Sequence, residues 1–224
     1  MHNRFPAGGA ERVTMDIASY LKEYGGYEVF VYASRISEAQ LNDEMLSNFT
    51  LRKIPTQLIS HSRTKQIERY ILEDEIDILV QPGKAIPGIE KIKERTCVKT
   101  IVACHGEPFW QRHVIMHRRQ KGFFRKLMWH LFNKRRFEDG TLAMRMAISR
   151  TRRDYETSDA YTVLCRSYIQ ETLSVLGLDE ASSRIYAIEN SERRVAEVNY
   201  NKENIILFVG RFENWSKRID RLLR

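Results

Sequence analysis

The chain has 224 residues, of which 42% are hydrophobic and 10% aromatic, a composition typical of a globular protein and not of a disordered one. Its apolar runs are strand-sized and residues 1–15 lack a continuous apolar stretch, so the sequence predicts neither a membrane-spanning helix nor a signal peptide. Three cysteines without CxxC spacing are more typical of small buried side chains than of a disulfide framework, and we expect a cytoplasmic protein.

The net charge of +8 comes from one segment. Residues 112–136 hold nine Lys and Arg side chains and no acid, whereas the rest of the chain holds 28 basic and 29 acidic groups. Such a distribution indicates one local anionic partner and not a generally basic protein.

Helical and strand patterns alternate along the chain. Val13, Ile17, Leu21 and Tyr24 recur at helical spacing, and short β-branched or aromatic runs bounded by Gly or Pro indicate strands. In chain order the patterns predict a helix at 13–24, strands at 27–34 and 49–55, a helix at 61–75, a strand at 76–83, a helix at 88–95, a strand at 98–108, a mostly helical stretch to about 156, a strand at 160–165, a helix at 167–177, strands at 184–190 and 204–212, and a helix from 217.

This alternation predicts an α/β fold with a Rossmann-like parallel sheet covered on both faces. The polar stretch 190–203 suggests a boundary, so we expect a first domain over 1–200 and the start of a second over 201–224. In open α/β sheets, ligands bind beyond the carboxyl ends of the strands, and the residues that follow each strand are therefore the candidates for a site.

Gly8 and Gly9 precede the first helix, where glycine lets the backbone approach a phosphate and the helix N–H groups point toward it. A plain tight turn with a glycine cap is the favoured interpretation of a lone double glycine. No GxGxxG pattern is present, which disfavours a nicotinamide-dependent enzyme. Such a turn normally follows a buried strand, but only four residues precede Phe5, so we expect that strand to be missing.

His105 ends an apolar strand and is followed by Gly106, Glu107 and two aromatic residues. An imidazole at a strand tip can hydrogen-bond a sugar hydroxyl or a phosphate, although a histidine that merely caps the strand is as consistent with the sequence. The other histidines show no metal-ligand spacing, so we expect no metal site.

Arg211 follows the strand "ILFVG", and Lys217 lies at the start of the next predicted helix. Two cations that converge with a helix N-terminus form a suitable clamp for a diphosphate. The alternative is two solvated surface charges.

Phe123, Phe124, Leu127, Met128 and Leu131 fall on one arc of a helical wheel within the basic segment. An apolar stripe flanked by cations is typical of a helix that lies on an anionic membrane, and the expected membrane contacts are Arg118, Arg119, Lys121, Arg125 and Lys126. The stripe is equally consistent with packing on the sheet.

A basic nucleic-acid-binding module is the alternative function, because phosphate contacts need only Lys and Arg side chains on one face. No DNA- or RNA-reading motif is present, however, and we expect no nucleic-acid partner.

Four stretches, "GGAERV", "VACHGEPFW", "YAIENSE" and "LFVGRFENWSKRIDRLL", occur in an order and at intervals that resemble the retaining glycosyltransferases of the GT-B fold, in family 4, and within it bacterial surface-polysaccharide enzymes. The resemblance implies a nucleotide-sugar donor and a saccharide or lipid-linked acceptor, with no cofactor and no metal. It implies that His105 contacts the transferred sugar as the catalytic residue, and that Glu107 and Asn190 are possible donor or acceptor contacts. Its diphosphate-binding residues correspond to Gly8, Gly9, Arg211 and Lys217.

The chain also departs from the family pattern. Asn190-Ser191 stands where the family usually has Asn-Pro, and the carboxylate pair of the second domain has no counterpart. With the first strand also expected to be missing, we expect a chain truncated at both ends that is inactive alone. The resemblance places it in the cytoplasm, peripheral on the inner face of the cytoplasmic membrane.

Overall fold

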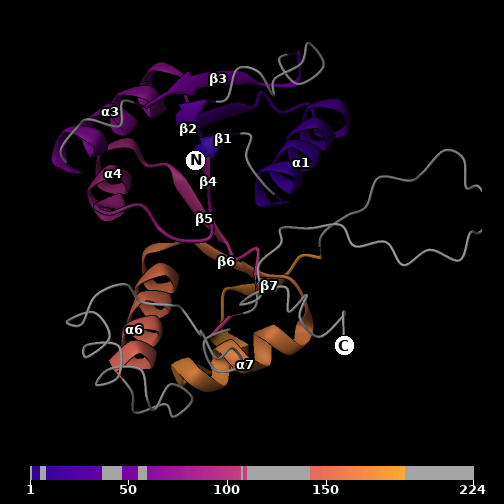
Figure 1. The fold of residues 1–224 in the computed structure, drawn as a ribbon, viewed down its shortest axis with the longest axis vertical. Helices are drawn as coiled ribbons and strands as arrows, with labels where there is room; N and C mark the ends of the chain where they lie inside the picture. Colours follow the sequence, from indigo (N-terminus) through magenta and orange to yellow (C-terminus); the bar gives the residue numbers. More distant parts are fainter. Residues whose placement is uncertain are drawn as a thin grey trace, which may run out of the picture. The chain divides into compact units, whose positions relative to one another are not determined.

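The computed structural model describes residues 2–5, 9–36, 47–54, 60–106, 108–109 and 142–189 (Figure 1). The elements in these ranges follow the predicted alternation closely, whereas the strand and helix predicted beyond residue 203 lie outside the described residues. In chain order they are β1 (His2–Phe5), α1 (Gly9–Gly25), β2 (Phe30–Ile36), β3 (Thr50–Lys53), α3 (Ser60–Glu73), β4 (Ile78–Pro82), α4 (Ile89–Thr96), β5 (Lys99–Ala103), α6 (Leu142–Thr157), β6 (Ala160–Val163), α7 (Arg166–Leu176), a short 3-10 helix (Glu180–Ser182) and β7 (Ile185–Ala187).

Every strand pair in the described residues is parallel, which confirms the predicted α/β fold class. The hydrogen-bond ladders form two sheets, one with the order β1-β2-β3 and one with the order β4-β5-β6-β7. The helices α1, α4, α6 and α7 each connect two strands that pair in parallel, because a parallel pair needs a long crossover. All strands of a sheet therefore end at one edge.

The prediction that the strand before the glycine turn is missing is wrong. His2–Phe5 forms β1 and pairs with β2, with His2 opposite Ala33 and Phe5 opposite Ile36. Phe5 is fully buried in a cluster with Ala18 of α1 and packs edge-on against the Phe49 ring, with the centroids 5.6 Å apart. Burial of this one large ring secures a strand that is otherwise too short and polar to recognise by pattern.

The β2 strand lies between α1 and α3. Val31 and Ala33 point toward the cluster that α1 covers, while Tyr32 and Ser34 point the other way, as the two-residue period of a strand requires. On that second face, the Tyr32 hydroxyl donates to the Tyr70 carbonyl at 3.1 Å and to a carboxylate oxygen of Asp74 at 2.9 Å. This first sheet is thus covered on both faces.

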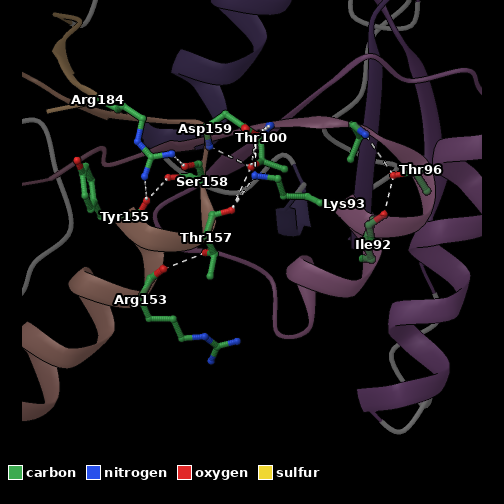
Figure 2. A network of polar contacts seen from close by, with 11 residues as sticks. Ile92, Lys93, Thr96, Thr100, Arg153, Tyr155, Thr157, Ser158, Asp159 and Arg184 are labelled. Carbon is green, nitrogen blue, oxygen red and sulfur yellow. Dashed lines mark hydrogen bonds and ion pairs between the residues drawn. The ribbon is translucent and has the colours of Figure 1, made fainter. Parts of the chain in front are cut away.

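A polar network joins the second sheet to its helices at the amino ends of the strands (Figure 2). The Asp159 carboxylate accepts from the Thr100 backbone N–H at 2.7 Å and pairs with Lys93 Nζ at 2.8 Å. Lys93 also donates to the Thr157 carbonyl, and Arg184 donates to the Ser158 carbonyl at 2.9 Å. These contacts tie α4, the end of α6 and the residue before β7 to one corner of the sheet.

Burial works against the charged form of Asp159, yet the hydrogen bonds from Lys93 and Thr100 lower its pKa overall. A carboxyl whose folded pKa is depressed stabilises the protein above its unfolded pKa, and this contribution is lost as the pH falls through the folded pKa. Asp159→Asn is therefore expected to lower the free energy of unfolding by about 1–2 kcal/mol at neutral pH. Urea unfolding from about pH 2 to pH 7 should show the variant and parent converging in acid.

Glu156→Gln is the control, because Glu156 is an exposed carboxylate near the end of α6, three residues before Asp159. It should leave the unfolding midpoint unchanged at every pH. If the free energy of unfolding of Asp159→Asn differed from that of the parent by the same amount at every acid pH, the charge of Asp159 would not contribute to folding stability.

Candidate functional site

The tips of β4, β5 and β6 meet at the carboxyl edge of the second sheet. The Gly83 N–H donates to the Ala103 carbonyl at 2.6 Å, and the Cys104 N–H donates to the Thr162 carbonyl at 2.9 Å. These bonds extend the parallel ladders just past the strands and place Gly83 and Cys104 side by side. His105 is the second residue after β5, so its position at this edge agrees with the predicted strand tip.

His105 is partly buried, and burial lowers its pKa below the ordinary value for histidine. The Glu11 carboxylate acts in the opposite direction, which means that the imidazole lies within electrostatic range of the first turn of α1. Gly9 is the first residue of that helix. The first turn of α1 is therefore close enough to His105 for its carboxylate to act on the imidazole.

A neutral imidazole carries one donor and one acceptor nitrogen, so it suits exchange of hydrogen bonds with a hydroxyl group. A protonated imidazole would instead attract an anion. The lowered pKa favours the first kind of ligand, and a sugar hydroxyl is one example of it.

The turn after β4 is held by two buried polar side chains that come from different elements. Gln81 is 1% exposed and its Oε1 accepts from the Ile86 N–H at 2.7 Å, while Asp154 of α6 is 6% exposed and its Oδ1 accepts from the Ala85 N–H at 3.1 Å. Burial raises the pKa of Asp154. Both side chains thereby fix the backbone of the turn, residues 83–86, that follows β4.

Gln81 has a further property that bears on ligand binding. Its Nε2 is buried without a hydrogen-bond partner in the described part of the chain. An unsatisfied buried donor costs about 1–3 kcal/mol, so a partner such as a ligand oxygen at this edge would stabilise it. The sequence predicted a strand at 76–83, which contains Gln81, but it gave no signal for Asp154, which is 69 residues from Ala85.

Most predicted site residues lie outside the described residues, so their positions stay predictions. This set comprises Gly8, Glu107, Asn190, Arg211, Lys217 and the expected membrane contacts Arg118, Arg119, Lys121, Arg125 and Lys126. Within the described ranges, no group of three His, Cys, Asp or Glu side chains is placed to hold a metal ion. The described helices include none that is both long and apolar enough to span a bilayer.

The electrostatic contact between Glu11 and His105 gives a direct test. Glu11→Gln removes the carboxylate that opposes the effect of burial, so the pKa of His105 is expected to fall further below about 6.5. Titration of the imidazole followed by NMR measures this shift. Glu23→Gln, at the other end of α1, should leave the titration unchanged. A higher His105 pKa in Glu11→Gln would contradict the proximity.

Comparison with known proteins identifies a family. The model of Glycosyltransferase Family 4 matches residues 7–191. No curated protein is significantly similar to the sequence. Among solved structures, the chain is similar to WaaG, a glycosyltransferase involved in lipopolysaccharide biosynthesis, with 16% identity and a TM-score of 0.46 over 84% of this chain and 43% of WaaG. A putative UDP-N-acetylglucosamine 2-epimerase from Listeria monocytogenes is similar at 13% identity and a TM-score of 0.32, over 84% of this chain and 68% of the epimerase. The chain thus spans less than half the length of WaaG.

Proposed function

Because the chain belongs to Glycosyltransferase Family 4, we propose that it moves a sugar, with retention, from a nucleotide-sugar donor to a saccharide or lipid-linked acceptor in cell-surface polysaccharide synthesis. The observation that supports this most directly is the family match, because it extends through both the glycine turn and His105. The partly buried His105 at the carboxyl edge also supports the proposal, because burial lowers its pKa and so favours an imidazole that can exchange hydrogen bonds with a sugar hydroxyl.

The proposed roles divide between the sugar and the diphosphate. His105 hydrogen-bonds the transferred sugar, with Glu107 and Asn190 as further contacts to donor or acceptor. The backbone of Gly8 and Gly9 is proposed to face the diphosphate, because Gly9 begins α1 and a helix N-terminus favours an anion.

Arg211 and Lys217 would stabilise the negative charge that builds up on the departing nucleotide diphosphate. Two fixed cations and helix N-termini can supply this stabilisation in a water-excluded site, so the proposal includes neither metal nor cofactor. The basic segment, residues 112–136, would bind the protein to the anionic inner face of the cytoplasmic membrane. The protein would meet its acceptor there.

The transfer reaction is tested with radiolabelled UDP-, GDP- and ADP-sugars and a bacterial lipid extract as the acceptor mixture. A complete enzyme that carries this chain should move label from one donor into the lipid or saccharide fraction, whereas the 224-residue chain alone should not. His105→Ala should lower turnover with less effect on nucleotide affinity, because its contact is with the sugar. Release of label only as free sugar, or no response to any donor, would contradict the proposal.

A further inference from the structure

The C-terminal half of α1 exposes a pair of tyrosine rings on the side away from its buried Ala18. Tyr20 is 63% exposed and Tyr24 is 68% exposed, and these residues are one helical turn apart. Their ring centroids lie 4.9 Å apart with the planes inclined by 33°. The two rings therefore form one tilted aromatic surface that faces outward from the helix (α1 in Figure 1).

A third exposed tyrosine is fixed at the end of the same helix. Gly26 has a φ of +66°, which reverses the chain, and Tyr27 is 56% exposed. A Cβ atom at Gly25 would come within 2.6 Å of the Tyr27 ring, so the ring lies directly on the glycine backbone. Tyr20, Tyr24 and Tyr27 are hereafter called the tyrosine cluster. Helix geometry places the first two rings together, and the third ring contacts Gly25.

The charges near the tyrosine cluster limit what it can bind. Residues 17–28 contain one basic side chain, Lys22, and two acidic ones, Glu23 and Glu28. Lys22 Nζ donates a hydrogen bond to the Ser47 carbonyl, and this contact uses one of its donor hydrogens. A hydrogen bond to the Glu23 carboxylate raises the pKa of Tyr24, so phenol and carboxylate lie together. Within residues 17–28 two carboxylates outnumber the one cation, which disfavours anionic lipid or nucleic acid, whereas a neutral ligand rich in hydroxyl groups finds aromatic faces and acceptors.

We propose that the tyrosine cluster binds a neutral saccharide chain. Aromatic faces pack against the C–H faces of sugar rings, and the phenol hydroxyls and carboxylates can exchange hydrogen bonds with sugar hydroxyls. Tyr24 lies 15 residues from Gly9, or about 22 Å along the helix axis at 1.5 Å per residue. The cluster is therefore a second saccharide site, separate from the proposed transfer site and independent of whether transfer occurs.

Affinity electrophoresis of the full chain through gels that contain dextran, neutral mannan or neutral galactan tests the proposal. At least one neutral polysaccharide should retard the protein, and added salt should not abolish the effect. Tyr20→Ala combined with Tyr24→Ala should weaken the apparent affinity at least tenfold, the loss expected when a stacking ring is removed. The matched control is Tyr186→Ala, which removes a 53% exposed tyrosine from β7 and should behave like the parent.

Tyr20→Phe combined with Tyr24→Phe keeps the rings and should retain most of the binding, and unchanged urea midpoints show that the alanine variants are folded. Retardation by none of the three polysaccharides would overturn the proposal, as would equal retardation of the parent and the double alanine variant. A double alanine variant that instead changes the oligomeric state of the chain would assign the cluster to self-association and also overturn it.

Discussion

Replacing Arg211 or Lys217 with alanine is expected to lower kcat of the complete enzyme by about 10²–10³-fold. In the proposed clamp, each change would remove a cation that faces the charge developing on the leaving diphosphate, a loss on the order of 2–4 kcal/mol by comparison with a removed oxyanion donor. Steady-state rates at saturating donor measure the effect. Because the stabilisation is greatest in the transition state, kcat should fall more than the affinity for the donor.

Lys202→Ala is the matched control, since it removes a nearby cation that is not part of the predicted clamp. It should leave kcat within about twofold of the parent, as surface substitutions usually do. Near-normal rates in both the Arg211 and the Lys217 variants would reject the diphosphate clamp, although they would leave the family assignment intact.

The second large effect is expected at the membrane. Changing Arg118, Arg119, Arg125 and Lys126 together to Gln should weaken binding to anionic vesicles by roughly three orders of magnitude, because each basic residue near the surface contributes about 1 kcal/mol. Co-sedimentation with vesicles measures the bound fraction. Binding of the parent should need anionic lipid and should fade with added salt, because salt screens the attraction.

Arg166→Gln serves as a control, because Arg166 is an exposed cation at the start of α7 outside the basic segment. It should co-sediment like the parent. Equal binding of the parent to neutral and anionic vesicles, or binding to neither, would mean that residues 112–136 serve the fold and not the membrane.

The sequence predicted the parallel fold well because strands buried on both faces are continuous apolar runs that end at Gly or Pro. The run at 76–83 became β4 followed by Gly83, and the helix predicted at 88–95 was found at Ile89–Thr96. It failed at β1, where one fully buried ring, Phe5, secures a strand of four residues. Short-range patterns do not record such a contact, because it depends on Phe49, which is 44 residues later in the chain and directly precedes β3.

In the candidate site, too, local sequence patterns predicted some features, whereas contacts between distant residues could not be predicted. His105 was predicted because it follows an apolar strand directly, and the structure places it at the carboxyl edge. The hydrogen bond by which Asp154 supports the turn after β4 could not be predicted, because it joins residues 69 positions apart. In the sequence, Asp154 lies among arginines in a predicted helix and resembles an ordinary solvated charge. Partners that are distant in sequence decide which polar side chains are buried.

The corner at which Asp159 meets Thr100 joins residues 59 positions apart, so a long loop must close before β5 and β6 can pair. The entropic cost of closing a loop rises only slowly with its length, by about 0.6 kcal/mol for each doubling. The separation between Thr100 and Asp159 therefore costs little in equilibrium stability, but it delays the pairing of β5 with β6 during folding, because contacts distant in sequence form slowly.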